Sequence, residues 1–270
     1  MKKTILILTV FATIFSSCKK DSPKNSTSSG VEVKRNYVVK IEKNNSPYKE
    51  YTYSGSKIIK ISNYSNMGNL NDYTSFTYRI NSLLTASVFN YDGELQYKFV
   101  YHYPDNITSN PDYAFYYEDE DTGKISFSYE NNKLKSWKFS FSNDTNTLIE
   151  TKFYWNGNNI QKREFYYNED LDKGLKLEEY SDFEYDNKKN PLYKQFFYFA
   201  VLMFDDDMRM CSENNIIKRT TYNSSYNIQE YSSYRFSNIY NGNGEIYKAS
   251  KLDFFTNDTL DVQTFIYQTW

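Results

Sequence analysis

The chain has 270 residues, of which 39% are hydrophobic and 19% aromatic, and its formal net charge is -2. Two cysteines and one histidine are too few for a multi-histidine metal centre, a zinc motif or a disulfide framework, so we expect no bound metal. The near-neutral charge also argues against a nucleic-acid partner, because nucleic-acid-binding domains carry a basic surface.

The first 17 residues have the pattern of a signal peptide. Lys2 and Lys3 precede an apolar run over residues 5–15, which is shorter than the roughly 20 residues that a membrane-spanning helix needs. Residues 15–18, Phe-Ser-Ser-Cys, resemble a bacterial lipobox, and this resemblance implies that Cys18 carries a lipid in the mature protein. The alternative is an ordinary cleaved signal peptide that happens to contain a cysteine.

Residues 18–34 are expected to form a flexible tether. Residues 19–30 are polar, with one proline and no large apolar side chain. Such a segment cannot bury enough apolar surface to offset the entropy lost on ordering. We therefore expect one folded region, a tyrosine-rich β-repeat domain over residues 35–270.

Along this domain, aromatic residues alternate with polar residues over many short runs. Alternation with a period of two places every second side chain on one face of a β-strand, so the pattern predicts an all-β domain. A helix is considered only for residues 193–210, which are equally compatible with strand and loop. The clearest runs are residues 97–103, 113–117, 127–129, 137–141, 153–155, 165–167, 183–185, 234–236 and 265–267.

The aromatic residue that precedes each expected turn recurs at a regular interval. The first five members of this series are 25 or 26 residues apart. A strand and its turn take roughly ten to thirteen residues, so each interval holds one hairpin. The spacing predicts an antiparallel meander of repeated β-hairpins, about 14–18 strands in an extended or curled sheet. The series consists of Tyr53, Tyr78, Tyr103, Tyr129, Trp155, Tyr185, Cys211, Phe236 and Tyr267.

A transmembrane β-barrel is the alternative that we reject on the sequence. Charges interrupt both faces of many strands, and hydrocarbon would penalise an outward lysine or arginine by about 2–4 kcal/mol near the bilayer midplane. The aromatics Phe265 and Tyr267 are also out of step with the last residue, Trp270.

Some turn segments have a familiar form. Residues 91–95 (Tyr-Asp-Gly-Glu-Leu) and 240–246 (Tyr-Asn-Gly-Asn-Gly-Glu-Ile) resemble the tyrosine–aspartate hairpin repeat of bacterial surface and toxin-shell proteins. Residues 185–192 and 212–216 resemble the hairpins of uncharacterised Bacteroidota lipoproteins built from such repeats. The resemblance covers most of residues 45–270 and implies an architecture and an envelope location. It implies no activity.

The densest aromatic run gives the candidate binding residues. These aromatics form either an exposed platform for a glycan or protein, with the acids of residues 118–121 as a polar rim, or the most buried strand pair of the domain. They flank the only histidine, His102. The candidates are Tyr97, Tyr101, Tyr103, Tyr113 and Tyr117.

No residue is assigned a catalytic role. His102 has no second histidine or serine motif from which a triad could be built, and we interpret Cys211 as a small buried hydrophobe. The nine glycines form no phosphate-cradling loop, so we expect neither a cofactor nor enzymatic activity.

The sequence thus predicts a non-catalytic envelope lipoprotein. We expect it to be lipid-anchored at the outer membrane, on the cell surface or the periplasmic face, and to bind a glycan or an envelope protein through its β-sheet. The alternative is a structural spacer or an assembly scaffold of an envelope complex.

Overall fold

The computed structural model describes residues 35–80, 82–104, 110–141, 148–168, 174–193, 198, 202 and 211–269. Residues Arg35–Trp270 form one compact unit. The expected signal peptide, the tether and Cys18 lie outside the described residues, as does most of the range 193–210.

The described residues form sixteen β-strands and a short 3-10 turn at Glu230–Ser232. The first eight strands are β1 (Asn36–Lys43), β2 (Ser46–Ser54), β3 (Lys57–Tyr64), β4 (Leu70–Arg79), β5 (Ser82–Asn90), β6 (Leu95–His102), β7 (Tyr113–Glu118) and β8 (Asp121–Glu130). The second eight are β9 (Lys133–Phe141), β10 (Ile149–Asn156), β11 (Asn159–Tyr167), β12 (Lys176–Lys189), β13 (Asn214–Asn223), β14 (Tyr234–Tyr240), β15 (Ile246–Asp253) and β16 (Thr259–Thr269).

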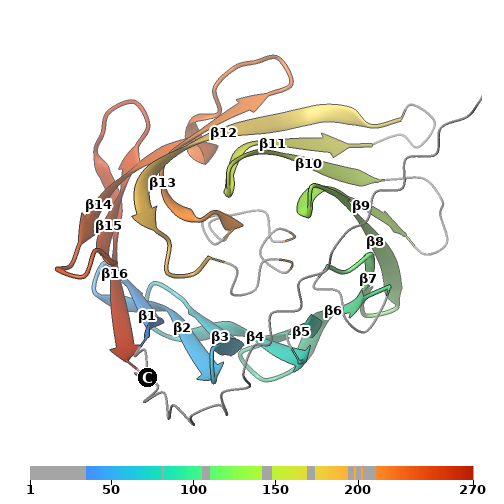
Figure 1. Cartoon of the computed structure of the whole chain (residues 1–270), viewed down its shortest axis with the longest axis horizontal. Coiled ribbons are helices and arrows are strands. Elements are labelled where there is room, and N and C mark those ends of the chain that lie inside the picture. Colours follow the sequence, from blue (N-terminus) through green and yellow to red (C-terminus); the bar gives the residue numbers. More distant parts are fainter. Residues whose placement is uncertain are drawn as a thin grey trace, which may run out of the picture. The chain divides into compact units, whose positions relative to one another are not determined.

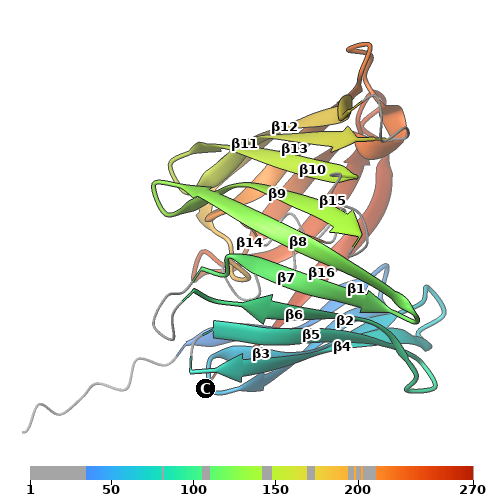
Figure 2. The same cartoon turned by 90° about the vertical axis from the view of Figure 1, so that its right-hand side faces the viewer.

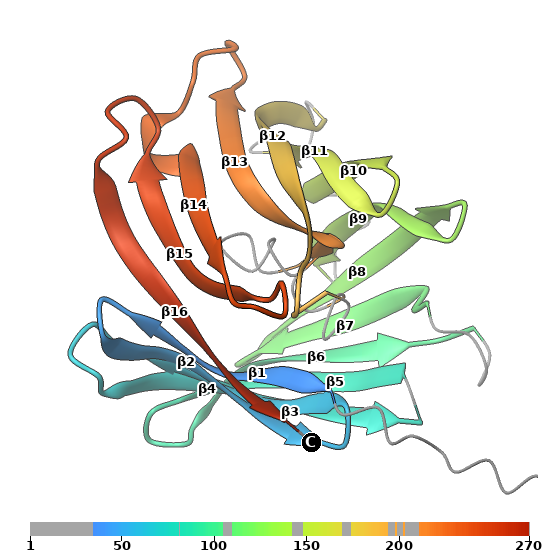
Figure 3. The ribbon, with the colours of Figure 1, turned by 60° about the vertical axis from the view of Figure 1, so that its left-hand side comes forward.

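The strands form an antiparallel meander that closes into a barrel (Figure 1). Each strand pairs with its neighbours in sequence, and β1 pairs with β16 over Asn36–Lys43 and Gln263–Thr269. Figure 3 shows these two strands side by side. The all-β meander and the strand number agree with the sequence prediction. The sequence did not decide whether the expected extended or curled sheet closes on itself, and the structure corrects that description to a closed barrel, because the edges of the first and last strands are paired with each other.

The turns lie alternately at the two ends of the barrel (Figure 2). We call one the near end, because β1 starts there and β16 finishes there. The opposite end carries the turns 44–45, 65–69, 91–94, 119–120, 224–233 and 254–258, and we call these turns the far rim.

The inner wall forms the hydrophobic core. Alternate side chains of each strand point inward, and buried aliphatic and aromatic residues line the wall around the whole barrel. They include Val38, Ile58, Phe76, Leu83, Phe99, Ile125, Leu134, Trp137, Phe153, Ile160, Phe183, Ile216, Phe236, Ile246 and Phe265. Aromatics supply much of this core, as the composition requires.

The regular aromatic series has a physical role at the near end. Each of the seven members with a polar ring atom donates a hydrogen bond to a backbone carbonyl of the preceding hairpin, at 2.6–2.9 Å. We call these residues the anchors. The donor and acceptor pairs are Tyr53–Val38, Tyr78–Ile58, Tyr103–Leu83, Tyr129–Pro111, Trp155–Leu134, Tyr185–Ile160 and Tyr267–Ile246.

Most of these acceptors directly precede a β-bulge. Ile59 and Leu84, for example, have no partner in the ladder between β2 and β3 or between β4 and β5. A bulge interrupts the ladder locally, and the anchor supplies a donor to the carbonyl beside the interruption. Successive hairpins are therefore joined by one partly buried side-chain hydrogen bond in addition to the strand ladder.

Two members of the series were assigned wrongly. Cys211 and Phe236 are both buried but have no hydroxyl to donate. Tyr240 occupies the anchor position of its hairpin, because it pairs with Ile246 as Tyr78 pairs with Leu83. Its hydroxyl donates to the Asp186 carboxylate instead of a carbonyl.

Candidate binding surfaces

The five candidate tyrosines do not share one surface. Tyr97, Tyr101 and Tyr103 point to the inside of the barrel and contact the core. Tyr101 is 4% exposed, and burial raises its pKa far above the usual value. The pairing of Tyr101 with Ala114 turns Ala114 inward and leaves Tyr113 and Tyr117 on the outside.

The outer face of β7 carries a line of three aromatic side chains. The rings of Tyr113 and Phe115 lie 5.3 Å apart, and those of Phe115 and Tyr117 lie 6.3 Å apart. Phe115 is 36% exposed and Tyr117 40% exposed. We call these three residues the outer stripe. Sequence reasoning found its two tyrosines and missed Phe115, although its position between them in an alternating run is a signal for it.

Polar groups hold one end of the outer stripe in place. The His102 ring stacks on Tyr113 at 4.3 Å with an angle of 8°, and Lys124 Nζ lies 4.6 Å from the Tyr113 ring centroid. Asp112 Oδ1 lies 2.9 Å from His102 Nδ1 and accepts a 2.9 Å hydrogen bond from the Tyr113 backbone N–H. The stripe therefore has a fixed ring at one end and exposed rings along its length.

The rest of the outer wall carries many charged groups beside scattered exposed apolar side chains such as Tyr154, Ile239 and Tyr247. Lysine–glutamate pairs lie on it, with N–O distances of 3.0, 3.7, 2.8 and 2.6 Å for Lys40–Glu42, Lys138–Glu150, Lys162–Glu164 and Lys218–Glu184. Lysine ammonium groups also cover tyrosine rings, as Lys60 does over Tyr73 at 4.2 Å. The charged lysine and glutamate side chains of this wall keep part of their hydration where water reaches them.

Glu164 is the best-satisfied acid of this wall. Its carboxylate accepts hydrogen bonds from Lys162 Nζ at 2.8 Å, Tyr154 Oη at 2.7 Å and Tyr166 Oη at 2.8 Å. Burial acts to raise its pKa, but the three donors outweigh burial and lower it. The carboxylate is therefore charged at neutral pH and already paired, which leaves it no role as a general acid.

Two arginines are buried on the inner wall. Arg163 donates to Glu179, and Arg219 Nε lies 3.1 Å from Thr221 Oγ1 and 3.3 Å from Ser181 Oγ. Burial, followed by the like charge of Arg219, lowers the pKa of Arg163 to about 10. Arg163 thus stays cationic at neutral pH, and the hydrogen bonds of the two arginines join β11, β12 and β13.

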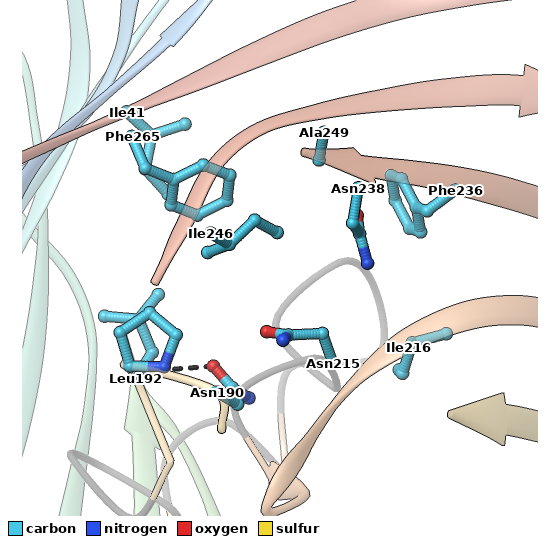
Figure 4. Close-up of a pocket in the computed structure, with 11 residues that line it drawn as sticks. Ile41, Asn190, Leu192, Asn215, Ile216, Phe236, Asn238, Ile246, Ala249 and Phe265 are labelled. Carbon is cyan, nitrogen blue, oxygen red and sulfur yellow. Dashed lines mark hydrogen bonds between the residues drawn. The ribbon is translucent and has the colours of Figure 1, made fainter. Parts of the chain in front are cut away.

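A small cavity lies inside the barrel, close to the end that we call the near end (Figure 4). Three amide side chains, Asn190, Asn215 and Asn238, face it together with apolar groups such as Phe236 and Phe265. Its volume is about 30 Å³. Since a water molecule needs roughly 10–15 Å³ on this scale, the cavity holds one or two waters and no larger ligand.

We also searched the described residues for a metal site and for a membrane-spanning helix. No three of their His, Cys, Asp or Glu side chains gather into a possible metal site. Within the same ranges, no helix is long and apolar enough to cross a membrane.

The described strands define the class of closed antiparallel β-barrels, and solved structures are similar to it. A porin-like protein from Bacteroides vulgatus superposes with a TM-score of 0.50 at 12% identity, covering 86% of this chain and 99% of that one. A porin-like protein from Bacteroides uniformis gives a TM-score of 0.47 at 12% identity, covering 86% of this chain and 98% of that one. No protein-family model matches the sequence, and no curated protein matches it either.

Proposed function

We propose that this protein is a non-catalytic lipoprotein of the bacterial outer membrane whose barrel stands in water and binds a glycan through the outer stripe. The observation that carries the proposal is the outer stripe itself, in which the exposed rings of Phe115 and Tyr117 continue from the half-buried ring of Tyr113 on one outer strand. Aromatic rings exposed side by side on a polar wall are a common feature of interaction sites.

The charge on the outer wall supports a barrel in water. A barrel that crosses a bilayer needs an apolar outer band about 25 Å tall, and each lysine within it would cost about 2–4 kcal/mol. Here mid-strand pairs such as Lys138–Glu150 and Lys162–Glu164 lie on the outside. We therefore assign membrane attachment to the lipid on Cys18, which the lipobox resemblance implies.

The filled inner wall argues against a channel like that of a porin. Porin barrels have a polar, water-filled interior. In this chain the inward side chains are mostly aliphatic and aromatic, and many are buried. The barrel therefore serves as a rigid support for its outer surface.

The chemistry of the outer stripe suits a glycan. A sugar ring places its C–H face on an aromatic ring, and its hydroxyls take hydrogen bonds from neighbouring polar groups. Phe115 and Tyr117 offer exposed rings, while His102 and Lys124 lie at the Tyr113 end of the stripe.

Native affinity electrophoresis tests this proposal. Gels containing an α-glucan, a β-glucan, a xylan or a mannan would be run with wild type and with the double variant Tyr113→Ala/Tyr117→Ala. We expect one polysaccharide to retard the wild type and not the double variant. Tyr247→Ala, on the outer wall of β15 and 51% exposed, is the matched control and should behave as wild type.

Two results would refute glycan binding at the outer stripe. One is equal migration of wild type and the double variant in every gel. The other is equal loss of retardation in the Tyr247→Ala control. Unchanged thermal unfolding of the double variant shows that its barrel is intact.

The runner-up function is a spacer or assembly scaffold. The observation that favours it is the closed ladder of strands reinforced by the anchors, which gives a stiff body without a free sheet edge among the described strands. A wild-type protein that binds no polysaccharide but whose deletion disperses an envelope complex would favour this function.

A further inference from the structure

The far rim carries exposed apolar side chains on turn after turn. Tyr231 is 100% exposed, Met67 88% and Tyr226 71%. Tyr91, Ile228 and Phe255 are also exposed, so four of the six turns that define the far rim present at least one large apolar group. Apolar groups repeated around one end of a protein mark an interaction surface.

The charges of the far rim all have one sign. Its six described turns contain acidic residues and no lysine or arginine. All of these acids are exposed to solvent. They are Asp92, Glu94, Asp119, Glu120, Glu230 and Asp258. A basic surface is the complement of such a rim.

The longest described turn of the far rim is held rigidly (Figure 3, the orange loop at the top). Asn223 Oδ1 accepts hydrogen bonds from the backbone N–H groups of Ser225 at 3.0 Å and Asn227 at 2.9 Å. Tyr226 between them has a φ of 63°, which is rare for a bulky residue. The aromatic side chain is thus presented at little further entropic cost on binding.

The far rim also lies opposite the start of β1 and the end of β16. The first strand starts and the last strand finishes at the near end, so a tether that leads into Asn36 reaches the barrel there. If the chain is anchored through Cys18, as proposed above, the far rim is the end directed away from that attachment point.

We propose that the far rim is a docking surface for a protein with a basic face. Tyrosine, phenylalanine and methionine are enriched at the centres of protein interfaces, and acids around them steer a basic partner into place. A lipid surface fits less well, because envelope membranes are anionic and the charged residues within the six turns are all acidic, with Arg235 beside Asn257 as a cation that contacts them. Aliphatic groups such as Met67 and Ile228 also offer no ring on which a sugar could stack.

The test measures binding of a labelled peptide in which lysines alternate with leucines, by fluorescence anisotropy at low salt. Reversing two rim charges, Glu230→Lys/Asp258→Lys, should weaken binding about tenfold. The control Glu130→Lys/Glu184→Lys makes the same change in net charge away from the far rim and should have little effect. Tyr231→Ser should also weaken binding about tenfold, and Tyr247→Ser should not.

Each other outcome overturns the proposal. Equal weakening by both charge reversals means that only the net charge attracts the peptide. No binding by the wild type means that the far rim does not recognise a basic polypeptide. Sedimentation with phosphatidylethanolamine–phosphatidylglycerol vesicles that depends on Tyr231, without peptide binding, means that the far rim contacts lipid. The polysaccharide gels test the outer stripe and the peptide assay tests the far rim, so glycan binding and docking of a basic protein can be refuted independently of each other.

Discussion

Replacing single tyrosines by phenylalanine distinguishes two hydroxyls that lie two residues apart on the inside of the barrel. Tyr103 Oη donates to the Leu83 carbonyl at 2.9 Å, beside the bulge in β5. Tyr101 Oη is buried and has no hydrogen-bond partner among the described residues. Both substitutions remove a tyrosine hydroxyl, which is hydrogen-bonded in Tyr103 and, in Tyr101, buried without a hydrogen bond to the described part of the chain.

The expected effects have opposite signs. Removing a donor that satisfies a carbonyl costs about 1–3 kcal/mol, so Tyr103→Phe should destabilise the barrel by that amount. Removing a buried hydroxyl that makes no hydrogen bond relieves a desolvation cost, so Tyr101→Phe should be neutral or stabilising by about 1 kcal/mol. In a domain of this size each kcal/mol moves the melting temperature by roughly 2–4 °C.

Urea unfolding followed by circular dichroism measures both variants, with Tyr231→Phe as the exposed control. A Tyr101→Phe variant as unstable as Tyr103→Phe would show that the Tyr101 hydroxyl has a partner. A neutral Tyr103→Phe would refute the role given to the anchors. An unchanged m value is required for either comparison, because it shows that the unfolding transition exposes the same surface.

Three further predictions concern the barrel wall. Burial raises the pKa of the anchor tyrosines above the ordinary 10.0, so their contribution to stability should be complete below about pH 10 and fall at higher pH, and the share of the tyrosinate absorbance that comes from the anchors should appear only as the chain unfolds. The lowered pKa of Glu164 predicts stability that is present above the unfolded-state pKa and lost as pH falls through the folded-state value, so Glu164→Gln should flatten the acid limb of the stability curve. Gly123→Ala places a Cβ 2.2 Å from the Phe139 ring and should cost about 1–3 kcal/mol in thermal unfolding, whereas Gly242→Ala meets no atom within 4 Å and should be silent.

Local patterns in the sequence were sufficient for the strands and, on most of them, for the inward face. Alternating aromatics mark inward positions on strands such as β6 and β8 but not on β7, and the turn residues are those that tolerate positive φ, as Asn131 and Asn132 do at 52° and 61°. The regular series of aromatics identified the anchors because one hydrogen bond per hairpin requires one donor per interval.

Closure could not be read from these local patterns. Whether β1 meets β16 depends on the twist and stagger accumulated over sixteen strands, and no short segment encodes that sum. The charges on the strands argued only against a barrel in lipid. A closed barrel with charges outside and aromatics inside satisfies the same pattern.

The candidate site was predicted in part for a similar reason. Tyr101, Tyr103, Tyr113 and Tyr117 all have odd numbers, and continuous alternation would place them on one face. The loop between β6 and β7 resets the register, so the second pair faces outward. The small residue Ala114, inward between large outward rings, is the local sign of that reversal.

Because the first and last strands pair, the ring of strands is continuous, and the polypeptide could begin at any strand and still form the same neighbouring pairs. Asn36 pairs with Thr269, and the Thr269 hydroxyl donates to Asn36 Oδ1 at 2.5 Å. A circular permutant that joins these ends by a short linker and opens the chain at residues 91–94 keeps every neighbouring strand pair. In such a permutant the new chain ends lie at the far rim, so any group attached to a chain end is moved from one end of the barrel to the other.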